Sequence, residues 1–249
     1  MMPSSLAKAC FAACRAALAG VAVVTALTVA VPAQAADYAA LVAASDRSAA
    51  DRQADAKRHP VELLEFIAPQ PGWRVLDMAA GAGYSTELLA RAVAPGGKVF
   101  AQHSRPSDKF GERKASPAMA DVEDVITPFD DLSRPALHDL DLVTFLFGYH
   151  DTTFLEVDRA RMDTALFDAL KPGGILVVAD YSARPEDGAT VGKSLHRIAE
   201  ATLRAEIEAA GFRLVGAGDF LRHPEDARTA TSSNNPTPVD AFVLKFRKP

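Results

Sequence analysis

Residues 75–89 read VLDMAAGAGYSTELL, and this stretch decides the fold. An apolar run that ends at Asp77 predicts a β-strand, the small residues 79–83 predict a tight turn, and the residues from Tyr84 onward predict a helix. Small side chains let the backbone approach a ligand closely, and the free N–H groups at a helix start attract negative charge. The stretch therefore predicts a loop that holds a nucleotide-like cofactor.

The glycine spacing in this loop separates two classes of cofactor. A dinucleotide-binding loop has the pattern G-x-G-x-x-G, but the matching positions here are Gly81, Gly83 and Thr86, so the third glycine is missing. Asp77 instead begins a D-x-G-x-G-x-G pattern, with Ala79 at its first glycine position. The segment resembles motif I of class I S-adenosylmethionine-dependent methyltransferases.

Further segments resemble the same superfamily in the same order along the chain. They are the entries to the predicted second, fourth and fifth strands and the turn before the sixth, at residues 95–100, 141–143, 170–176 and 210–212. The chain also resembles an exported, poorly characterised bacterial group of predicted methyltransferases, at residues 55–60, 84–89, 149–151, 195–197 and 242–249. The resemblance implies a Rossmann-like, seven-stranded, mostly parallel sheet with an antiparallel C-terminal edge strand and helices on both faces.

The resemblance also implies S-adenosylmethionine as the cofactor and assigns its contacts. The predicted cofactor-binding residues are Asp77, Ala79, Gly81, Gly83, Tyr84, His103, Asp130 and Asp131. The superfamily generally carries an acid at the end of the second strand, where it accepts hydrogen bonds from both ribose hydroxyls. His103 stands at that place, and a neutral imidazole can accept only one such bond. The methyl group of Ala79 is expected to cost little if its φ angle stays negative.

The resemblance also implies a contact between the cofactor's adenine and two acidic residues before the fourth strand. Asp130 stands where the superfamily places an acid beside the adenine amino group, and Asp131 follows it. A turn or a helix cap is the alternative interpretation of this pair.

A polar group follows the predicted fourth strand, where a ligand lies in open α/β sheets. Tyr149, His150 and Asp151 are therefore the predicted catalytic residues. The His150 imidazole would take a proton from the methyl acceptor near neutral pH, with Asp151 or Tyr149 fixing its tautomer. A capping or packing histidine is the alternative.

A second histidine lies further along the chain. His196 precedes Glu200 by four residues, so a local pair on one face of a helix is the simplest interpretation. The alternative places His196 over the cleft, facing the end of the fifth strand. No metal is expected, although a divalent site built from Asp151, Asp180 and either His150 or His196 is an alternative that no sequence spacing fixes.

Alternating βα units predict the order of elements after residue 74. Strands are expected at 74–78, 98–102, 122–126, 140–147, 175–181, 212–220 and 240–247. Helices are expected at 61–67, 85–93, 156–170 and 193–210. A polar helix or a pair of helices over the cofactor cleft is expected within residues 37–58, with a loose solvated arm as the alternative. Residues 222–238 are expected to form a long mobile loop, either a substrate lid or an ordinary surface excursion.

The N-terminus reads as an export signal, with Lys8 and Arg15, an apolar stretch at 16–31 and an A-x-A site ending at Ala35. An uncleaved anchor is the alternative. The predicted division is a signal peptide at 1–35 and one methyltransferase-like domain at 36–249, with an N-terminal helical segment at 36–68. The domain is then expected to be periplasmic or secreted, with no stable membrane span after cleavage.

The composition limits the classes of molecule that the chain is expected to bind. The chain carries a net charge of -5 at pH 7, which disfavours nucleic acid and leaves a small molecule as the expected substrate. Both cysteines precede residue 36, so the mature domain has no disulfide and no thiolate metal site.

The leading hypothesis is S-adenosylmethionine-dependent methyl transfer to a small-molecule acceptor. A second hypothesis is an exported, non-enzymatic binding module that has lost the donor. A third is an NADP-linked reductase that uses Ser104 and Arg105, which the missing third glycine disfavours.

Overall fold

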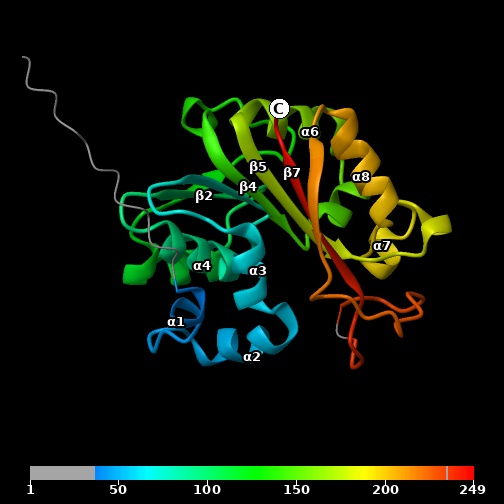
Figure 1. Cartoon of the computed structure of the whole chain (residues 1–249), viewed down its shortest axis with the longest axis horizontal. Helices are drawn as coiled ribbons and strands as arrows, with labels where there is room; N and C mark the ends of the chain where they lie inside the picture. Colours follow the sequence, from blue (N-terminus) through cyan, green and yellow to red (C-terminus); the bar gives the residue numbers. More distant parts are fainter. Residues whose placement is uncertain (1–36, 234) are drawn as a thin grey trace, which may run out of the picture. The chain divides into compact units, whose positions relative to one another are not determined.

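A single seven-stranded sheet organises the chain (Figure 1). The computed structural model describes residues 37–233 and 235–249, so the predicted signal segment lies outside the described residues. The strand order is β3-β2-β1-β4-β5-β7-β6. The strands are β1 (Arg74–Met78), β2 (Lys98–His103), β3 (Val122–Ile126), β4 (Leu140–Leu146), β5 (Leu170–Tyr181), β6 (Arg213–Gly218) and β7 (Ala241–Arg247).

The pairing of these strands confirms the predicted fold class. Strands β1 to β5 pair in parallel, whereas β7 pairs antiparallel with both β5 and β6. The antiparallel strand therefore lies one place inside the edge, and β6 forms the edge itself. Strand β7 runs antiparallel to β5 and leads to the chain's last residue. The carboxyl ends of the parallel strands therefore lie at the other end of the sheet, away from that residue (Figure 1).

The helices follow the predicted order with two differences. The α-helices are α1 (Tyr38–Val42), α2 (Ala49–Arg58), α3 (Pro60–Ile67), α4 (Tyr84–Val93), α5 (Asp108–Lys114), α6 (Arg159–Ala169), α7 (Gly192–Leu195) and α8 (Glu200–Ala209). The pair α1 and α2 confirms the predicted N-terminal helices, whereas α5 has no counterpart in the sequence prediction. A 3₁₀ turn, η3 (Tyr149–Thr153), follows β4.

The expected single helix at 193–210 is wrong. Helix α7 ends at Leu195 because His196 takes a left-handed conformation with φ 52°. Ile198 then forms a parallel β-bridge with Ser182, and α8 begins at Glu200. His196 and Glu200 consequently do not share a helical face, and the Glu200 carboxylate pairs with Arg222 instead.

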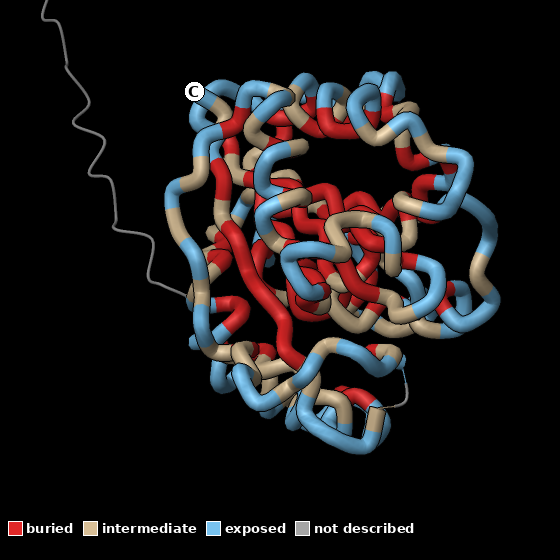
Figure 2. The backbone as a smooth tube through the Cα atoms, turned by 90° about the vertical axis from the view of Figure 1, so that its right-hand side faces the viewer, coloured by how far each residue is buried: buried red, intermediate tan, exposed pale blue. Residues whose placement is uncertain are grey.

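Alternating strand residues build two apolar layers, one on each face of the sheet. Leu76 and Met78 of β1 pack with a cluster that includes Leu166 of α6 and Leu203 of α8. Val75 packs on the opposite face with residues of α3 and α4. Buried backbone accordingly runs through the middle of the molecule in Figure 2, as expected for a parallel sheet covered on both faces.

Several segments gather at the carboxyl end of the parallel strands. Helices α2 and α7 and the 222–238 segment all lie at this end (Figure 1). Arg197, which has no exposed surface, donates to the carbonyl oxygens of Ala230 and Ser182 and to the Asp226 carboxylate. The expected long loop is thus fastened to the end of β5. Within the described residues, no helix has the length and hydropathy needed to cross a membrane.

Candidate active site

The loop after β1 has the conformation that a close backbone approach requires. Gly81 and Gly83 have φ angles of 59° and 80°, and Gly83 caps α4. A Cβ atom added at Gly81 would contact only the Ala79 carbonyl oxygen, at 3.8 Å. The surface beside Gly81 is therefore free for a ligand.

Ala79 corrects one sequence-based expectation. Its φ angle is 52°, not negative, and a left-handed alanine costs about 1 kcal/mol relative to glycine. The Gln102 side chain holds this conformation by accepting from the Ala79 N–H at 3.0 Å. A Cβ at Gly148 would lie 3.0 Å from the Ala79 methyl group, so the glycine after β4 makes room for the alanine after β1.

Asp77, near the end of β1, connects this strand to α4 and β4. Its carboxylate is buried and accepts from the Thr86 hydroxyl in α4 and the Thr144 hydroxyl in β4, each at 2.7 Å. Burial raises the pKa of Asp77, against the effect of these two hydrogen bonds. The structure thus gives Asp77 a role in fixing β1, β4 and the start of α4 relative to one another.

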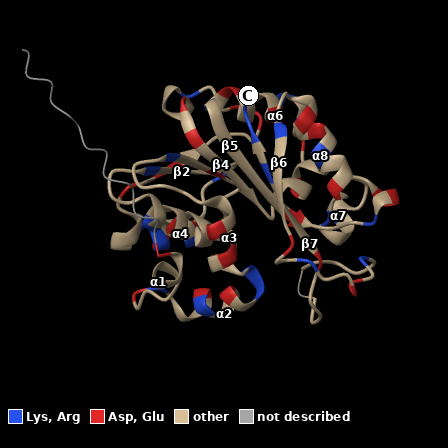
Figure 3. Cartoon of the chain, in the orientation of Figure 1, with Lys and Arg blue, Asp and Glu red and all other residues tan. Residues whose placement is uncertain are grey.

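Helix α2 is joined to the loop through Tyr84. The Tyr84 hydroxyl donates to Asp55 at 2.5 Å, and Arg47 donates to both oxygens of the same carboxylate at 2.7 and 2.8 Å. Burial raises the pKa of Asp55, but the hydrogen bonds from Arg47 and Tyr84 outweigh it and hold the pKa below its usual value. Both signs of charge are visible on α2 in Figure 3.

A second set of contacts joins α2 to the same loop through α5. Arg113 donates to the Ala82 carbonyl oxygen at 2.6 Å and to the carboxylates of Asp51 and Glu87. Sequence analysis missed Arg113 because these partners lie between 26 and 62 positions away from it in the chain.

His103 faces two acceptors. Its Nδ1 lies 2.7 Å from the Asp124 carboxylate on β3, and its Nε2 lies 3.0 Å from the Gly81 carbonyl oxygen. Both contacts are hydrogen bonds only when both ring nitrogens carry protons, and neither nitrogen is then left to accept from a ribose. The nearby carboxylate belongs to Asp124, which is about one-third exposed and which the sequence prediction did not include.

The two acids before β4 separate in the structure. The Asp131 carboxylate accepts from the Ser133 N–H at 3.1 Å, so the turn-cap alternative describes it. The Asp130 carboxylate lies 3.9 Å from Arg161 at the start of α6. Its adenine contact remains a prediction.

His150 is fixed by a carboxylate at the end of β5. Asp180 is fully buried; one oxygen accepts from His150 Nδ1 at 2.7 Å, and the other accepts from the His150 backbone N–H at 2.8 Å. Burial lowers the pKa of His150, but the hydrogen bonds with Asp151 and Asp180 dominate and raise it to about 9. A pKa this high favours the protonated imidazole at neutral pH, and the role of His150 as a general base stays a prediction.

His196 joins this cluster from α7. Its Nδ1 lies 3.6 Å from Asp151 Oδ1, and His150 Nε2 lies 3.2 Å from the same oxygen. The two imidazoles meet edge to face with centroids 5.4 Å apart. Gly192 allows this approach, because a Cβ there would lie 2.0 Å from the Thr153 hydroxyl oxygen and 2.7 Å from the His150 carbonyl oxygen.

Tyr149 does not belong to the same cluster. It is fully buried, and its hydroxyl contacts the carboxylates of Asp163 and Glu206 at 2.8 and 2.9 Å. These partners belong to α6 and α8, on the face of the sheet that packs against those helices. The predicted role of Tyr149 in fixing the His150 tautomer is corrected: Asp180 makes that contact.

A cavity of about 410 Å³ opens beside the ends of β4 and β5. Phe147 and Tyr181 line it, and their rings lie 5.0 Å apart. The C-terminal part of α2 contributes Ala56, and the 222–238 segment contributes Ser232 and Pro236. Residues of α2 and of the 222–238 segment therefore form part of the walls of this cavity.

The sequence of this chain is similar to those of known methyltransferases. The ubiE/COQ5 methyltransferase family matches residues 56–190. The ubiquinone/menaquinone biosynthesis C-methyltransferase UbiE of Ruegeria sp. (strain TM1040) is 30% identical over 136 residues, 51% of this chain and 49% of that protein. The demethylmenaquinone methyltransferase of Clavibacter sepedonicus is 33% identical over 131 residues, 50% of this chain and 48% of that protein. The chain spans about half the length of the curated relatives it matches.

Solved structures share the fold. A SAM-dependent methyltransferase from Aquifex aeolicus has a TM-score of 0.58 at 18% identity and covers 76% of this chain and 88% of its own. The [4+2]-cyclase SpnF has a TM-score of 0.57 at 19% identity and covers 81% of each chain. Because one of these proteins is named as a cyclase, the fold alone does not fix the reaction.

The match over more than half of the chain fixes the family. It agrees with the predicted cofactor, S-adenosylmethionine, and does not support the alternative of a non-enzymatic binding module. The resemblance to an exported bacterial group stays a prediction. The chain belongs to the ubiE/COQ5 methyltransferase family, within the class I S-adenosylmethionine-dependent methyltransferase superfamily.

Proposed function

We propose that the protein transfers a methyl group from S-adenosylmethionine to a small-molecule acceptor. The observation that carries this proposal is the loop after β1, in which Ala79, Gly81 and Gly83 all have left-handed φ angles and the Gly81 surface is open. This conformation leads directly into the N-terminus of α4, where backbone N–H groups have no partner within the helix. The family match supports the same assignment.

The residues around the loop fit the proposed cofactor. The Gly81 backbone would contact it, and the Asp124 carboxylate would take the place of the superfamily's ribose-binding acid, because His103 already faces two acceptors. Asp77 would keep the loop in position through its threonine contacts. The chemistry that S-adenosylmethionine supplies is a methyl group activated by a sulfonium, so the protein mainly has to align the acceptor and exclude water.

The cavity beside Phe147 and Tyr181 is the proposed acceptor site. It lies at the carboxyl ends of β4 and β5, next to the strand whose following loop binds the cofactor. Its aromatic residues suit a flat acceptor with apolar surface, and Ser232 also lines it, with a hydroxyl oxygen that can accept a hydrogen bond while it donates to the His196 carbonyl oxygen. The 222–238 segment would orient this acceptor from its anchored position.

Isothermal titration of the full chain with S-adenosylhomocysteine tests the cofactor site. We expect saturable binding, and we expect Asp124→Asn to weaken it about tenfold or more, since hydrogen bonds to a charged group contribute about 1.5–3 kcal/mol. Glu123→Gln is the matched control, because Glu123 is the preceding residue on β3 and pairs with Lys98 instead. Absence of heat with the unaltered chain at millimolar ligand would refute the function. Equal affinity for both variants would refute only the role of Asp124.

We also propose that this chemistry takes place outside the cytoplasm. The apolar stretch at 16–31 and the A-x-A site ending at Ala35 support this proposal. N-terminal sequencing of protein recovered from a bacterial periplasmic fraction should give Ala36 as the first residue. Recovery only in the cytoplasm with an intact Met1 would contradict it.

A further inference from the structure

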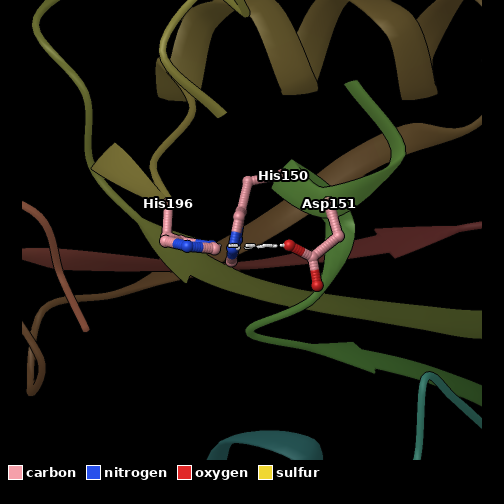
Figure 4. Close-up of side chains that lie close together, drawn as sticks. All are labelled: His150, Asp151 and His196. Carbon is pink, nitrogen blue, oxygen red and sulfur yellow. Dashed lines mark ion pairs between the residues drawn. The ribbon is translucent and has the colours of Figure 1, made fainter. Parts of the chain in front are cut away.

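We propose that His150, Asp151 and His196 form a binding site for one divalent transition-metal ion. Figure 4 shows the three side chains converging, with His150 and Asp151 extending from η3 and His196 from the end of α7. One potential ligand atom from each residue lies within 4.8 Å of the other two. The proposal concerns metal binding and stands independently of the methyl donor.

Two of the three spacings between the ligand atoms are close to those around a shared ion. Asp151 Oδ1 lies 3.2 Å from His150 Nε2 and 3.6 Å from His196 Nδ1. Atoms that each lie about 2.1 Å from one ion in tetrahedral or octahedral geometry are about 3.0–3.4 Å apart. The two spacings that involve Asp151 therefore need to change by only a few tenths of an ångström to hold an ion, and the two histidine nitrogens lie within 4.8 Å of each other.

The surroundings prepare His150 to act as a ligand. Asp180 accepts from His150 Nδ1, so Nε2 is the nitrogen directed toward Asp151. A carboxylate behind a metal-binding histidine fixes the ring and its tautomer in this manner. Metal binding would replace the proton that His150 holds on Nε2 when no ion is bound, and the Asp151 carboxylate would lie beside the ion.

The backbone also holds His196 in an unusual conformation. Its φ angle of 52° is uncommon for a residue other than glycine, and the Ser232 hydroxyl bonds its carbonyl oxygen at 2.8 Å. The neighbouring Gly192 lets α7 approach η3 closely enough for the His196 ring to reach Asp151. Two independent backbone features therefore converge on this one ring.

The donor set indicates the class of ion. Two imidazole nitrogens and one carboxylate oxygen suit Zn²⁺, Co²⁺ or Fe²⁺, whereas Mg²⁺ and Ca²⁺ prefer sites made of oxygen alone. The side chains of Asp151 and His196 are 40% and 38% exposed, so the ion would keep coordination positions open to solvent. Ser232, which bonds His196, also lines the cavity beside Tyr181. Water or an oxygen atom of a small molecule is the class of ligand that could fill an open position.

Titration of the full chain with ZnCl₂ after chelator treatment tests this site, with Co²⁺ absorption as a second readout. Cys10 and Cys14 are replaced by serine in every sample, so that thiolates cannot contribute. We expect one Zn²⁺ per chain and a visible Co²⁺ spectrum typical of nitrogen and oxygen ligands. Asp151→Asn and His196→Asn should each weaken Zn²⁺ binding at least a hundredfold; asparagine tolerates the left-handed backbone of His196.

His59→Asn is the matched control. His59 also has a left-handed backbone with φ 45°, is 37% exposed and lies 3.5 Å from a carboxylate, that of Glu62. It lacks a second histidine partner in the described part of the chain, and its replacement should leave Zn²⁺ affinity unchanged. Binding that is absent from the parent chain, or that survives both cluster variants, would overturn the proposal. Urea unfolding of each variant shows that a loss of binding is not a loss of folding.

Discussion

Tyr149 and His150 are neighbours in the chain, yet they enter two polar clusters of opposite character. Tyr149 points into the layer beneath α6 and α8, where its hydroxyl contacts Asp163 and Glu206. His150 contacts Asp180 and reaches the half-exposed Asp151 and His196. In both clusters carboxylates lie beside a residue whose pKa is raised, Tyr149 in one and His150 in the other. A shifted pKa alone therefore does not identify a functional site.

Access to solvent is what distinguishes the two clusters. Asp163 is 1% exposed and accepts from the Tyr149 hydroxyl, whereas Asp151 is 40% exposed. The buried Tyr149 hydroxyl and Asp163 carboxylate stabilise the fold through their contact, but they have no surface to offer a ligand. The difference in exposure indicates a stabilising role for the Tyr149 cluster and is consistent with the binding site that we propose at the His150 cluster.

The largest expected effect separates the clusters by stability. Tyr149→Ala removes a fully buried aromatic ring and should lower the free energy of unfolding by about 3–5 kcal/mol. Asp151→Ala removes only a half-exposed partner of two histidines and should lower it by less than about 1 kcal/mol. Urea unfolding of both variants in chelator measures the difference. Similar losses for the two would break the comparison.

A pH titration gives the next effect. Burial raises the pKa of Asp163 to about 7, against the opposing hydrogen bond from Tyr149, whereas the unfolded chain would ionise this carboxyl near pH 4. Between these values the folded state keeps a proton that the unfolded state loses. The stabilising contribution is therefore complete below about pH 4 and decreases as the pH rises toward 7, by about 1.4 kcal/mol per pH unit for one proton.

A comparison of the Asp163→Asn variant with the unaltered chain separates the contribution of Asp163 from that of all other titrating groups. The free energy of unfolding is measured for both chains from pH 4 to 8, and the difference between them should carry the slope. Parallel pH profiles for the two chains would show that Asp163 is ionised in the folded protein, contrary to its closed surroundings.

The smallest expected effect lies at the rim of the Tyr149 cluster. Arg159 pairs with Glu206 at 2.7 Å, but both side chains are about one-quarter exposed. Arg159→Met should lower the free energy of unfolding by no more than about 1 kcal/mol. It should also move the midpoint of the Asp163 titration upward, because Arg159 lowers that pKa. A downward shift of the midpoint would contradict the charge arrangement described here.

Sequence reasoning placed the turn after β1 and the polar residues after β4 correctly in the fold, because both depend on local pattern. It failed at Ala79, whose left-handed φ depends on Gln102 and on the room left by Gly148, residues 23 or more positions away. It also failed at the 193–210 segment, where helix propensity predicted one helix. The bridge between Ile198 and Ser182 interrupts that helix, and this tertiary contact has no local signal.

The sequence by itself determined the order of the strands, most of the helices, the turn at residues 79–83 and the family, because hydrophobic periodicity and glycine placement act over a few residues. The tertiary structure alone decided which side chains meet. Asp124 reaches His103, Asp180 fixes His150, and His196 turns toward Asp151. Each of these contacts joins residues from different strands or helices that lie far apart in the sequence. Contacts of this kind produce no local sequence pattern from which they could be predicted.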